Sequence, residues 1–278
     1  MTNGLSLLNV LSLETVENRA DTFVGQTMSR DAPNIYGGQY LGQSLAAAAS
    51  TVNERNAHAM HAFFLRSGDL RRPVEYVVER LQDGRSFARR RVQCFQNGSL
   101  LFSTIVSFQA KQDGLEHQTP MPTGMTPPDD LPPPVPPAPG MSSGLERAFD
   151  IREVPPSWRG RQDEHAIWIR AKEELPDDPD FHHAALAFAS DHALLLPALL
   201  RHGLDWRSDI AATSLDHALW LHTTVRMDEW HLFIHESPQS GGSRGLTSAR
   251  FYTRDGVQVA TAAQEGMVRV LLPQLAKR

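Results

Sequence analysis

The stretch His61-Ala62-Phe63-Phe64-Leu65-Arg66 has a counterpart later in the chain, His217-Ala218-Leu219-Trp220-Leu221-His222, which lies 156 residues further on. A second match sets Phe95-Gln96-Asn97-Gly98 against the stretch 252–256, and its Asn97 and Asp255 are 158 residues apart. Two matches at nearly the same spacing indicate an internal duplication. We therefore predict two copies of one structural unit.

Each copy is predicted to hold one helix followed by antiparallel strands. Apolar residues recur on one face of the first helix, at 38–52. The second, at 191–202, contains the run 193–200, which is apolar all round, and Pro197 either kinks this helix or delays its start. Asn97-Gly98 and Asp255-Gly256 mark hairpin turns. The expected strands are 57–65, 74–81, 87–95 and 100–108 in the first copy, and 214–225, 230–236, 246–253 and 257–270 in the second. This order favours an α+β fold, and the two sheets could join edge to edge.

A proline-rich segment separates the two copies. Residues 126–140 carry prolines that can neither continue a helix nor donate to a sheet ladder. We read the segment as an extended, semi-rigid linker, with one long surface loop as the alternative. The predicted organisation is an N-terminal unit at 1–111, a linker at 112–145 and a C-terminal unit at 146–278.

Composition and charge narrow the functional classes. The 278 residues are 41% hydrophobic, which is enough for a buried core, and the net charge of −5 gives no field to hold a nucleic acid. The only cysteine is Cys94, so a disulfide framework and a cysteine-rich zinc site are both excluded. No secretory signal, membrane-spanning run or peroxisomal address is recognised, and we expect a soluble cytoplasmic protein without a membrane partner.

Several short motifs lack the surrounding structure that their usual function requires. Gly241-Gly242-Ser243-Arg244-Gly245 has the G-x-S-x-G pattern, but no apolar strand precedes it and no helix follows, so we expect a flexible loop. The 12 histidines show no metal-ligand spacing, and we predict no metal site. At Gly37-Gly38 two readings stay open: a plain turn, or a helix start whose backbone N–H groups could polarise an oxygen.

Three polar residues of the second half stand where burial is expected. Asp191 begins the predicted second helix, where it could cap the helix or act as a base held ionised by the dipole, and capping is favoured on pattern alone. Ser214 opens a predicted strand, and Gln264 follows the apolar run 259–263, where a buried amide needs partners. Spacing alone does not bring these three residues together.

Seven stretches, in order along the chain, resemble the acyl-CoA thioesterase II family. They are Tyr36-Gly-Gly-Gln-Tyr-Leu-Gly-Gln43, His58-Ala-Met-His-Ala-Phe-Phe-Leu-Arg-Ser-Gly-Asp69, Leu81-Gln-Asp-Gly-Arg-Ser-Phe87, Trp168-Ile-Arg170, Ala189-Ser-Asp191, Ser214-Leu-Asp-His217 and Ala263-Gln-Glu-Gly266. The resemblance implies a double hotdog fold: two tandem units, each a helix wrapped by antiparallel strands, that form one continuous sheet.

The resemblance also implies an activity, the hydrolysis of fatty acyl-CoA to a free fatty acid and CoA without a metal or covalent cofactor. In the family an Asp, a Thr or Ser, and a Gln hold the attacking water, and by the motifs these fall on Asp191, Ser214 and Gln264. Many members have Thr where this chain has Ser214, which loses the methyl group that restricts the rotamer. By analogy we expect a homo-oligomer, a dimer or a tetramer.

The substrate suggests further candidates. Apolar residues that could line an acyl slot beside the helices are Phe63, Leu194, Leu195 and Trp220. Basic residues that could meet the phosphates of CoA are Arg66, Arg85, Arg89 and Arg244. Donors for the oxyanion are expected either from Gly37 and Gly38 or from the helix that begins at Asp191.

Two other functions compete with the thioesterase reading. An enoyl-CoA hydratase on a hotdog fold would need an Asp–His pair at a helix start, which Asp191-His192 superficially offers, but the apolar residues that follow do not fit. A non-catalytic acyl-CoA binding protein would have no use for three buried polar residues, each of which costs free energy to bury. Replacement of Asp191 by Asn distinguishes a hydrolase from a binder.

Overall fold

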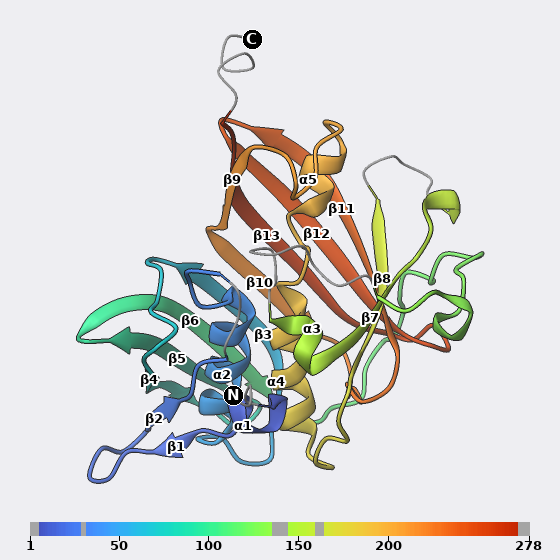
Figure 1. Ribbon diagram of the computed structural model, residues 1–278. Coiled ribbons are helices and arrows are strands. Elements are labelled where there is room, and N and C mark those ends of the chain that lie inside the picture. The colour runs from blue at the N-terminus through green and yellow to red at the C-terminus, as the bar shows by residue number, and fades with distance from the viewer. Residues whose placement is uncertain (1–5, 29–31, 135–143, 159–163, 272–278) are drawn as a thin grey trace.

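A computed structural model describes residues 6–28, 32–134, 144–158 and 164–271 of the chain (Figure 1). These residues form one antiparallel sheet of 13 strands. Helices α2 (Gly37–Ala49) and α4 (Pro179–Ser190) pack against each other and against one face of the sheet. The α+β class and the single continuous sheet are thereby confirmed. None of the helices in the described ranges is both long and apolar enough to cross a membrane.

The first unit contains the four predicted strands, as β3 to β6, and also a short helix and two short strands near its start that were not predicted. It comprises α1 (Leu7–Leu11), β1 (Glu14–Thr15), β2 (Thr22–Gly25), β3 (Asn56–Phe64), β4 (Val74–Asp83), β5 (Phe87–Gln96) and β6 (Ser99–Gln109). The strands lie in the order β1-β2-β4-β5-β6-β3. Asn97 and Gly98 both have positive φ, 50° and 75°, as a two-residue hairpin turn requires.

The second unit repeats this plan with extra strands. It comprises α3 (Leu145–Ala148), β7 (Phe149–Glu153), β8 (His165–Ala171), α5 (Leu196–Leu200), β9 (Ile210–Ser214), β10 (Asp216–Leu221), β11 (His231–Gly241), β12 (Arg244–Thr253) and β13 (Gln258–Val270). The order is β10-β13-β12-β11-β8-β7, and β9 also pairs with β13. Strands β3 and β10 pair antiparallel and join the two units into one sheet.

The register of this junction corrects the sequence match that revealed the duplication. Across it His217 pairs with Ala62, and Ala218 pairs with His61. His217 and Ala62 face the helices and are buried, whereas His61 is exposed on the other face. Because strand side chains alternate between faces, equivalent residues must be an odd number apart here, and an offset of 156 is even. His61 and His217 match in sequence but are not structurally equivalent.

The second helix is displaced from its prediction. α4 ends at Ser190, before the segment 191–202 that was expected to be helical. The short α5 begins only at Leu196, with Pro197 in its first turn, which agrees with a delayed start and not with a kink in a long helix. The signal that was missed is Asp178-Pro179: the carboxylate of Asp178 accepts the Asp180 N–H, and Pro179 occupies the first helical position. The apolar run was helical in pattern, but Ala193 has φ +55° and interrupts it.

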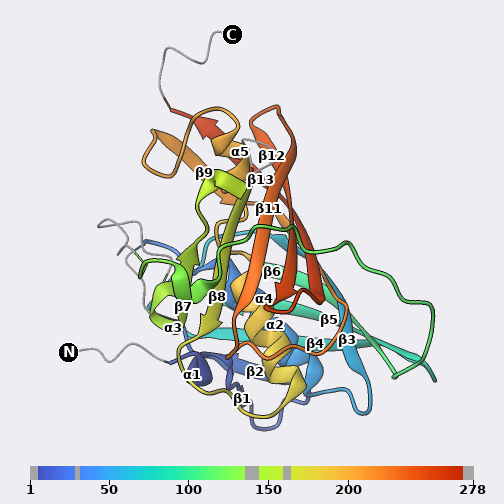
Figure 2. The same cartoon turned by 90° about the vertical axis from the view of Figure 1, so that its right-hand side faces the viewer.

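Two segments predicted as irregular have a definite place in the structure. The described part of the linker lies against the second unit, where Trp168 Nε1 donates to the Thr126 carbonyl at 2.9 Å and Leu131 is buried. Figure 2 shows this green segment crossing the sheet of the second unit. The expected flexible loop at 241–245 is instead the tight turn of the β11–β12 hairpin, with positive φ at Gly242 and Ser243. Residues 135–143 of the predicted linker lie outside the described residues.

Candidate active site

Asp191 stands at the end of a helix rather than at the start of one. It is the residue that follows α4, with φ −80° and ψ −6°, and its backbone N–H donates to the Ala189 carbonyl. The predicted N-cap role is therefore wrong, as is the expectation that the dipole of a following helix holds the carboxylate ionised, whereas the role of Asp191 as a base stays a prediction. The long α4 instead carries the carboxylate to the point where strands β9 and β13 meet.

A strand irregularity positions Ser214. It is the last residue of β9 and pairs with Gly266, whereas two residues into β10 the register has moved by one, so that Ala218 pairs with Ala263. The prediction that Ser214 opens a strand is wrong, because Ser214 ends β9 and the bulge separates it from β10. A slip of one residue turns a side chain to the opposite face of a sheet. The bulge thus places Ser214 on the same face as Gly266 and Gln264.

The three predicted residues meet in one hydrogen-bonded chain. Gln264 projects from β13 toward the helices and is 1% exposed. Its Nε2 donates to Ser214 Oγ at 2.8 Å, and Ser214 Oγ donates to Asp191 Oδ1 at 3.2 Å. The fold therefore assembles residues separated by 23 and 50 positions in sequence, which spacing alone did not bring together.

The chain continues to two residues that the sequence analysis did not select. His217 Nδ1 lies 2.6 Å from Gln264 Oε1, and His217 Nε2 lies 3.0 Å from Ser190 Oγ. Both residues are buried, and burial lowers the pKa of His217 to about 4. A usable signal was present, because His217 ends the quoted stretch Ser214-Leu-Asp-His217, and a buried imidazole needs partners.

The first unit supplies the facing wall. The carboxylate of Asp191 lies so close to α2 that a methyl group added at Gly37 would come within 2.6 Å of Oδ2. The same methyl would meet the ring of Phe64, at the end of β3, at 3.0 Å. The site therefore lies between the two units, with an acid and its partners from one and a helix N-terminus from the other.

Comparison with known proteins agrees with this architecture. Two family profiles match: "Acyl-CoA thioesterase N-terminal domain" over residues 26–109, and "Acyl-CoA thioesterase" over residues 146–267. Human acyl-coenzyme A thioesterase 8 is 36% identical over 94% of this chain and 88% of its own length. The chain belongs to the acyl-CoA thioesterase II family. It is a thioester hydrolase that acts on acyl-CoA.

Further relatives come from bacteria. Acyl-CoA thioesterase 2 of Haemophilus influenzae is 30% identical to this thioesterase over 95% of this chain and 97% of its own. The crystal structure of an acyl-CoA thioesterase II from Mycobacterium marinum superposes with a TM-score of 0.83, is 38% identical, and covers 95% of this chain and 98% of that one. This thioesterase II structure supports the double hotdog fold.

Within the thioesterase, the apolar candidates for the acyl slot divide between the two faces of the sheet. Leu194 is fully buried in the core that both units share, and Leu195 packs against Gly266. Phe63 and Trp220, by contrast, lie on the face away from the helices and are 61% and 36% exposed. Strand alternation gives the reason, because their neighbours Phe64 and Leu219 face inward, and this placement removes Phe63 and Trp220 from a slot beside the helices.

The basic candidates are spread along the thioesterase. Arg244 pairs with Glu265, the residue next to Gln264, at 2.9 Å. Arg66 follows β3 at the Phe64 end and donates to the Leu100 carbonyl. Arg85 belongs to the opposite end of that strand, roughly 26 Å away at the usual rise per residue. The exposed Arg89 is level with Ala59, five residues or roughly 17 Å along β3 from Phe64. Of the four arginines, Arg66 and Arg244 thus stand nearest the site.

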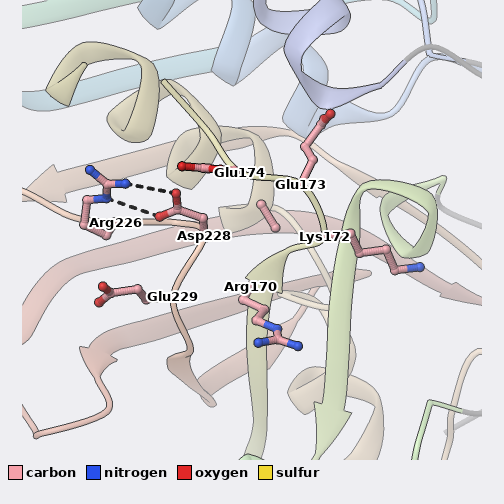
Figure 3. A pocket seen from close by; sticks show the side chains of 8 residues that line it. Arg170, Lys172, Glu173, Glu174, Arg226, Asp228 and Glu229 are labelled. Carbon is pink, nitrogen blue, oxygen red and sulfur yellow. Dashed lines mark hydrogen bonds and ion pairs between the residues drawn. The ribbon is translucent and has the colours of Figure 1, made fainter. Parts of the chain in front are cut away.

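A separate pocket of about 420 Å³ opens elsewhere on the thioesterase (Figure 3). Its lining mixes cations and carboxylates, and Arg226 is paired with both Asp228 and Asp177. The lining residues are Arg170, Ala171, Lys172, Glu173, Glu174, Arg226, Asp228 and Glu229. It contains none of the catalytic candidates. Within the described ranges, no group of three His, Cys, Asp or Glu side chains is arranged to hold a metal ion.

Proposed function

We propose that the enzyme hydrolyses fatty acyl-CoA by direct attack of a water molecule that Asp191 deprotonates and that Ser214 and Gln264 hold in place. The observation that carries the proposal is the chain from Gln264 Nε2 through Ser214 Oγ to Asp191 Oδ1, at 2.8 and 3.2 Å. A carboxylate within hydrogen-bond reach of a water can accept its proton as the oxygen attacks. The amide and the hydroxyl supply orientation instead of charge.

The oxyanion that forms during attack needs N–H donors, and the start of α2 is the proposed source. The first N–H groups of a helix have no partner within the helix and carry a partial positive charge. Gly37 and Gly38 hold these positions, and Gly37 lies beside the Asp191 carboxylate. The alternative source, a helix beginning at Asp191, does not fit because Asp191 follows the end of α4.

The proposed reaction proceeds in two steps. The water oxygen bonds to the thioester carbon while its proton passes to Asp191, and the carbonyl oxygen takes the negative charge beside the α2 N-terminus. The carbon–sulfur bond then breaks, the carbonyl re-forms, and the proton on Asp191 passes to the departing sulfur. The products are a fatty acid and CoA, and no covalent enzyme intermediate is formed.

The deciding experiment measures free-thiol release from acyl-CoA substrates of short, medium and long chain. Asp191→Asn keeps the shape of the side chain but removes the base, so we expect the kcat to fall by about 100- to 10,000-fold while acyl-CoA still binds. The length profile of the native enzyme tests whether the substrate is a fatty acyl chain.

Asp129→Asn provides the matched control, because Asp129 is a surface carboxylate paired with Arg254, and we expect native activity from it. Hydrolysis that survives in Asp191→Asn at the native rate would exclude Asp191 as the base. Hydrolysis confined to the shortest chains would retain the mechanism and remove the fatty acyl substrate.

A further inference from the structure

The proposed active site is one end of a longer hydrogen-bonded chain that runs into the protein interior. From Asp191 it passes through Ser214 and Gln264 to His217, and from there to Ser190 on the last turn of α4. Ser190 Oγ also lies 2.9 Å from the Ala187 carbonyl. Helix α4 thus carries both ends of the chain, because Asp191 directly follows Ser190.

Such a chain can point its hydrogens in either of two directions. In one, Ser190 donates to His217, His217 Nδ1–H donates to Gln264 Oε1, and the Gln264 amide donates onward to Ser214. In the other, the imidazole carries its hydrogen on Nε2 and the Gln264 amide is turned round, so that its oxygen faces Ser214. The hydroxyl of Ser214 would then donate its hydrogen to Gln264 instead of to Asp191.

A count of hydrogens shows that the two ends compete. With a neutral imidazole the hydrogen-bonded chain has one hydrogen fewer than it has contacts. Either the contact between Ser214 and Asp191 or the contact between Ser190 and the Ala187 carbonyl therefore lacks its hydrogen. A hydrogen bond to an ionised acceptor is roughly twice as strong as one between neutral groups. The carboxylate therefore takes the hydrogen, and the direction toward Asp191 is favoured.

We propose that His217 is a positioning residue of the thioesterase reaction: its Nδ1–H, with Nε2 anchored by Ser190, fixes the Gln264 amide with Nε2 toward Ser214. This inference rests on the proposed function, since it assigns a direction to the same Asp191–Ser214–Gln264 chain. His217 touches no substrate. Its effect is to prevent the amide from turning over and taking the Ser214 hydrogen away from the base.

The surroundings of His217 suit this role. The side chain is 1% exposed and Ser190 is fully buried, so no bulk water competes for either ring nitrogen. Burial holds the pKa of His217 at about 4, and the imidazole is neutral at physiological pH. A neutral ring has one donor and one acceptor nitrogen. It therefore accepts a hydrogen bond from one neighbour and donates one to the next, which sets the direction of the whole chain.

Nitrogen-15 NMR of histidine-labelled enzyme tests the tautomer without any substrate. The signals of His217 are identified as those missing from the His217→Asn spectrum. We expect a neutral ring protonated on Nδ1, with the Nδ1 proton coupled to its nitrogen and protected from exchange. A ring protonated on Nε2 would reverse the chain and overturn the proposal, whatever the kinetics show.

A pair of amide variants tests the catalytic role. The Asn side-chain nitrogen is bonded to Cγ, as His Nδ1 is, so His217→Asn can still donate to Gln264 Oε1. Gln places its nitrogen near the Nε2 position instead, which leaves Gln264 without that donor. We expect His217→Gln to lower kcat by roughly 10- to 100-fold with little change in KM, and His217→Asn to restore most of the activity.

Two controls separate positioning from folding. His231 is another buried histidine, 1% exposed, whose Nδ1 lies 3.0 Å from the Glu229 carbonyl, away from the chain, and we expect His231→Gln to keep the native kcat. In a Gln264→Leu background, His217→Gln should cost no further kcat because nothing remains to position. Additive losses of kcat would mean that His217 acts independently of Gln264, which would overturn the positioning role.

The outcomes also separate this inference from the proposed function. If Asp191→Asn abolishes hydrolysis while His217→Gln and His217→Asn are equally active, the base assignment stands and the positioning role fails. If Asp191→Asn retains full activity, the proposed function itself fails. Should His217→Gln not fold, the tautomer measured in the native enzyme still decides.

Discussion

Ser214 illustrates how this molecule holds one atom in place. Its side chain lacks the methyl group that restricts the rotamer of a threonine. In the structure Ser214 Oγ lies between Gln264 Nε2 and Asp191 Oδ1, so two hydrogen bonds fix what the rotamer leaves open. Gly37 also helps to position a single group, because the absence of its side chain leaves room for the Asp191 carboxylate.

Gly37→Ala should therefore reduce activity with little loss of stability. The new methyl group would come within 2.6 Å of Asp191 Oδ2, which is the mobile end of a side chain and moves away at small cost. A displacement of about 1 Å in a reacting group can cost roughly 100-fold in rate, and we expect a loss of 10- to 100-fold in kcat. Steady-state kinetics and a thermal melt on the same sample measure both effects. A native kcat in this variant would show that the carboxylate needs no space there.

At the scale of elements, two features bring the site together. The bulge between β9 and β10 turns Ser214 to the helix side, and the close contact of α2 with α4 sets the distance between Gly37 and Asp191. This helix contact depends on glycines. A methyl group at Gly38 would lie 2.0 Å from the Phe188 carbonyl, and one at Gly42 would lie 2.8 Å from the Ala184 carbonyl.

Gly38→Ala should consequently destabilise the fold, in contrast to Gly37→Ala. The obstructing atom is backbone of α4, so the helices themselves must separate, and overpacking of this kind costs about 1–3 kcal/mol. Chemical denaturation measures the free energy of unfolding. Gly114→Ala is the control, because an added methyl group there meets nothing within 4 Å. Equal stability of the two variants would contradict the close helix contact.

At the scale of the whole molecule, the two units share one interior. A single core cluster extends from Leu7 in the first unit to Ala262 in the second, and the two long helices lie within it. This core also encloses histidines. Burial lowers the pKa values of His217 and His231 from 6.5 to about 4, and it also lowers the pKa of His235.

These histidines make stability depend on pH. Between pH 6.5 and about 4 the unfolded chain binds protons that the buried rings of the folded state do not, so the free energy of unfolding is highest above pH 6.5 and falls as the pH drops. A shift of this size corresponds to about 3 kcal/mol for each ring. Thermal melts from pH 7.5 to 4.5 measure the slope, which His231→Asn should reduce. A Tm that is constant over this range would show that the rings do not resist protonation.

The local elements of the first unit were predictable because their signals are local. Helix α2 and strands β3 to β6 lie within a few residues of their predicted bounds, because periodicity and Asn97-Gly98 depend only on neighbouring residues. Helix α4 was missed because its apolar face is built largely from alanine, which gives a weak pattern beside the run 193–200. The cytoplasmic location and the homo-oligomer stay predictions.

The sequence by itself indicated the duplication and the α+β class, and its resemblance to a known family pointed to one continuous sheet and to Asp191, Ser214 and Gln264 as a proposed site. Their assembly was decided by the tertiary structure, because the contacts join residues 23 to 50 positions apart across a strand bulge and a helix end. Only the folded chain shows His217 inward and His61 outward, since a shift of one residue in register reverses the face of a side chain. Helix α2 of the first unit also meets Asp191 of the second unit only in the folded chain, because the packing of α2 on α4 depends on the whole core.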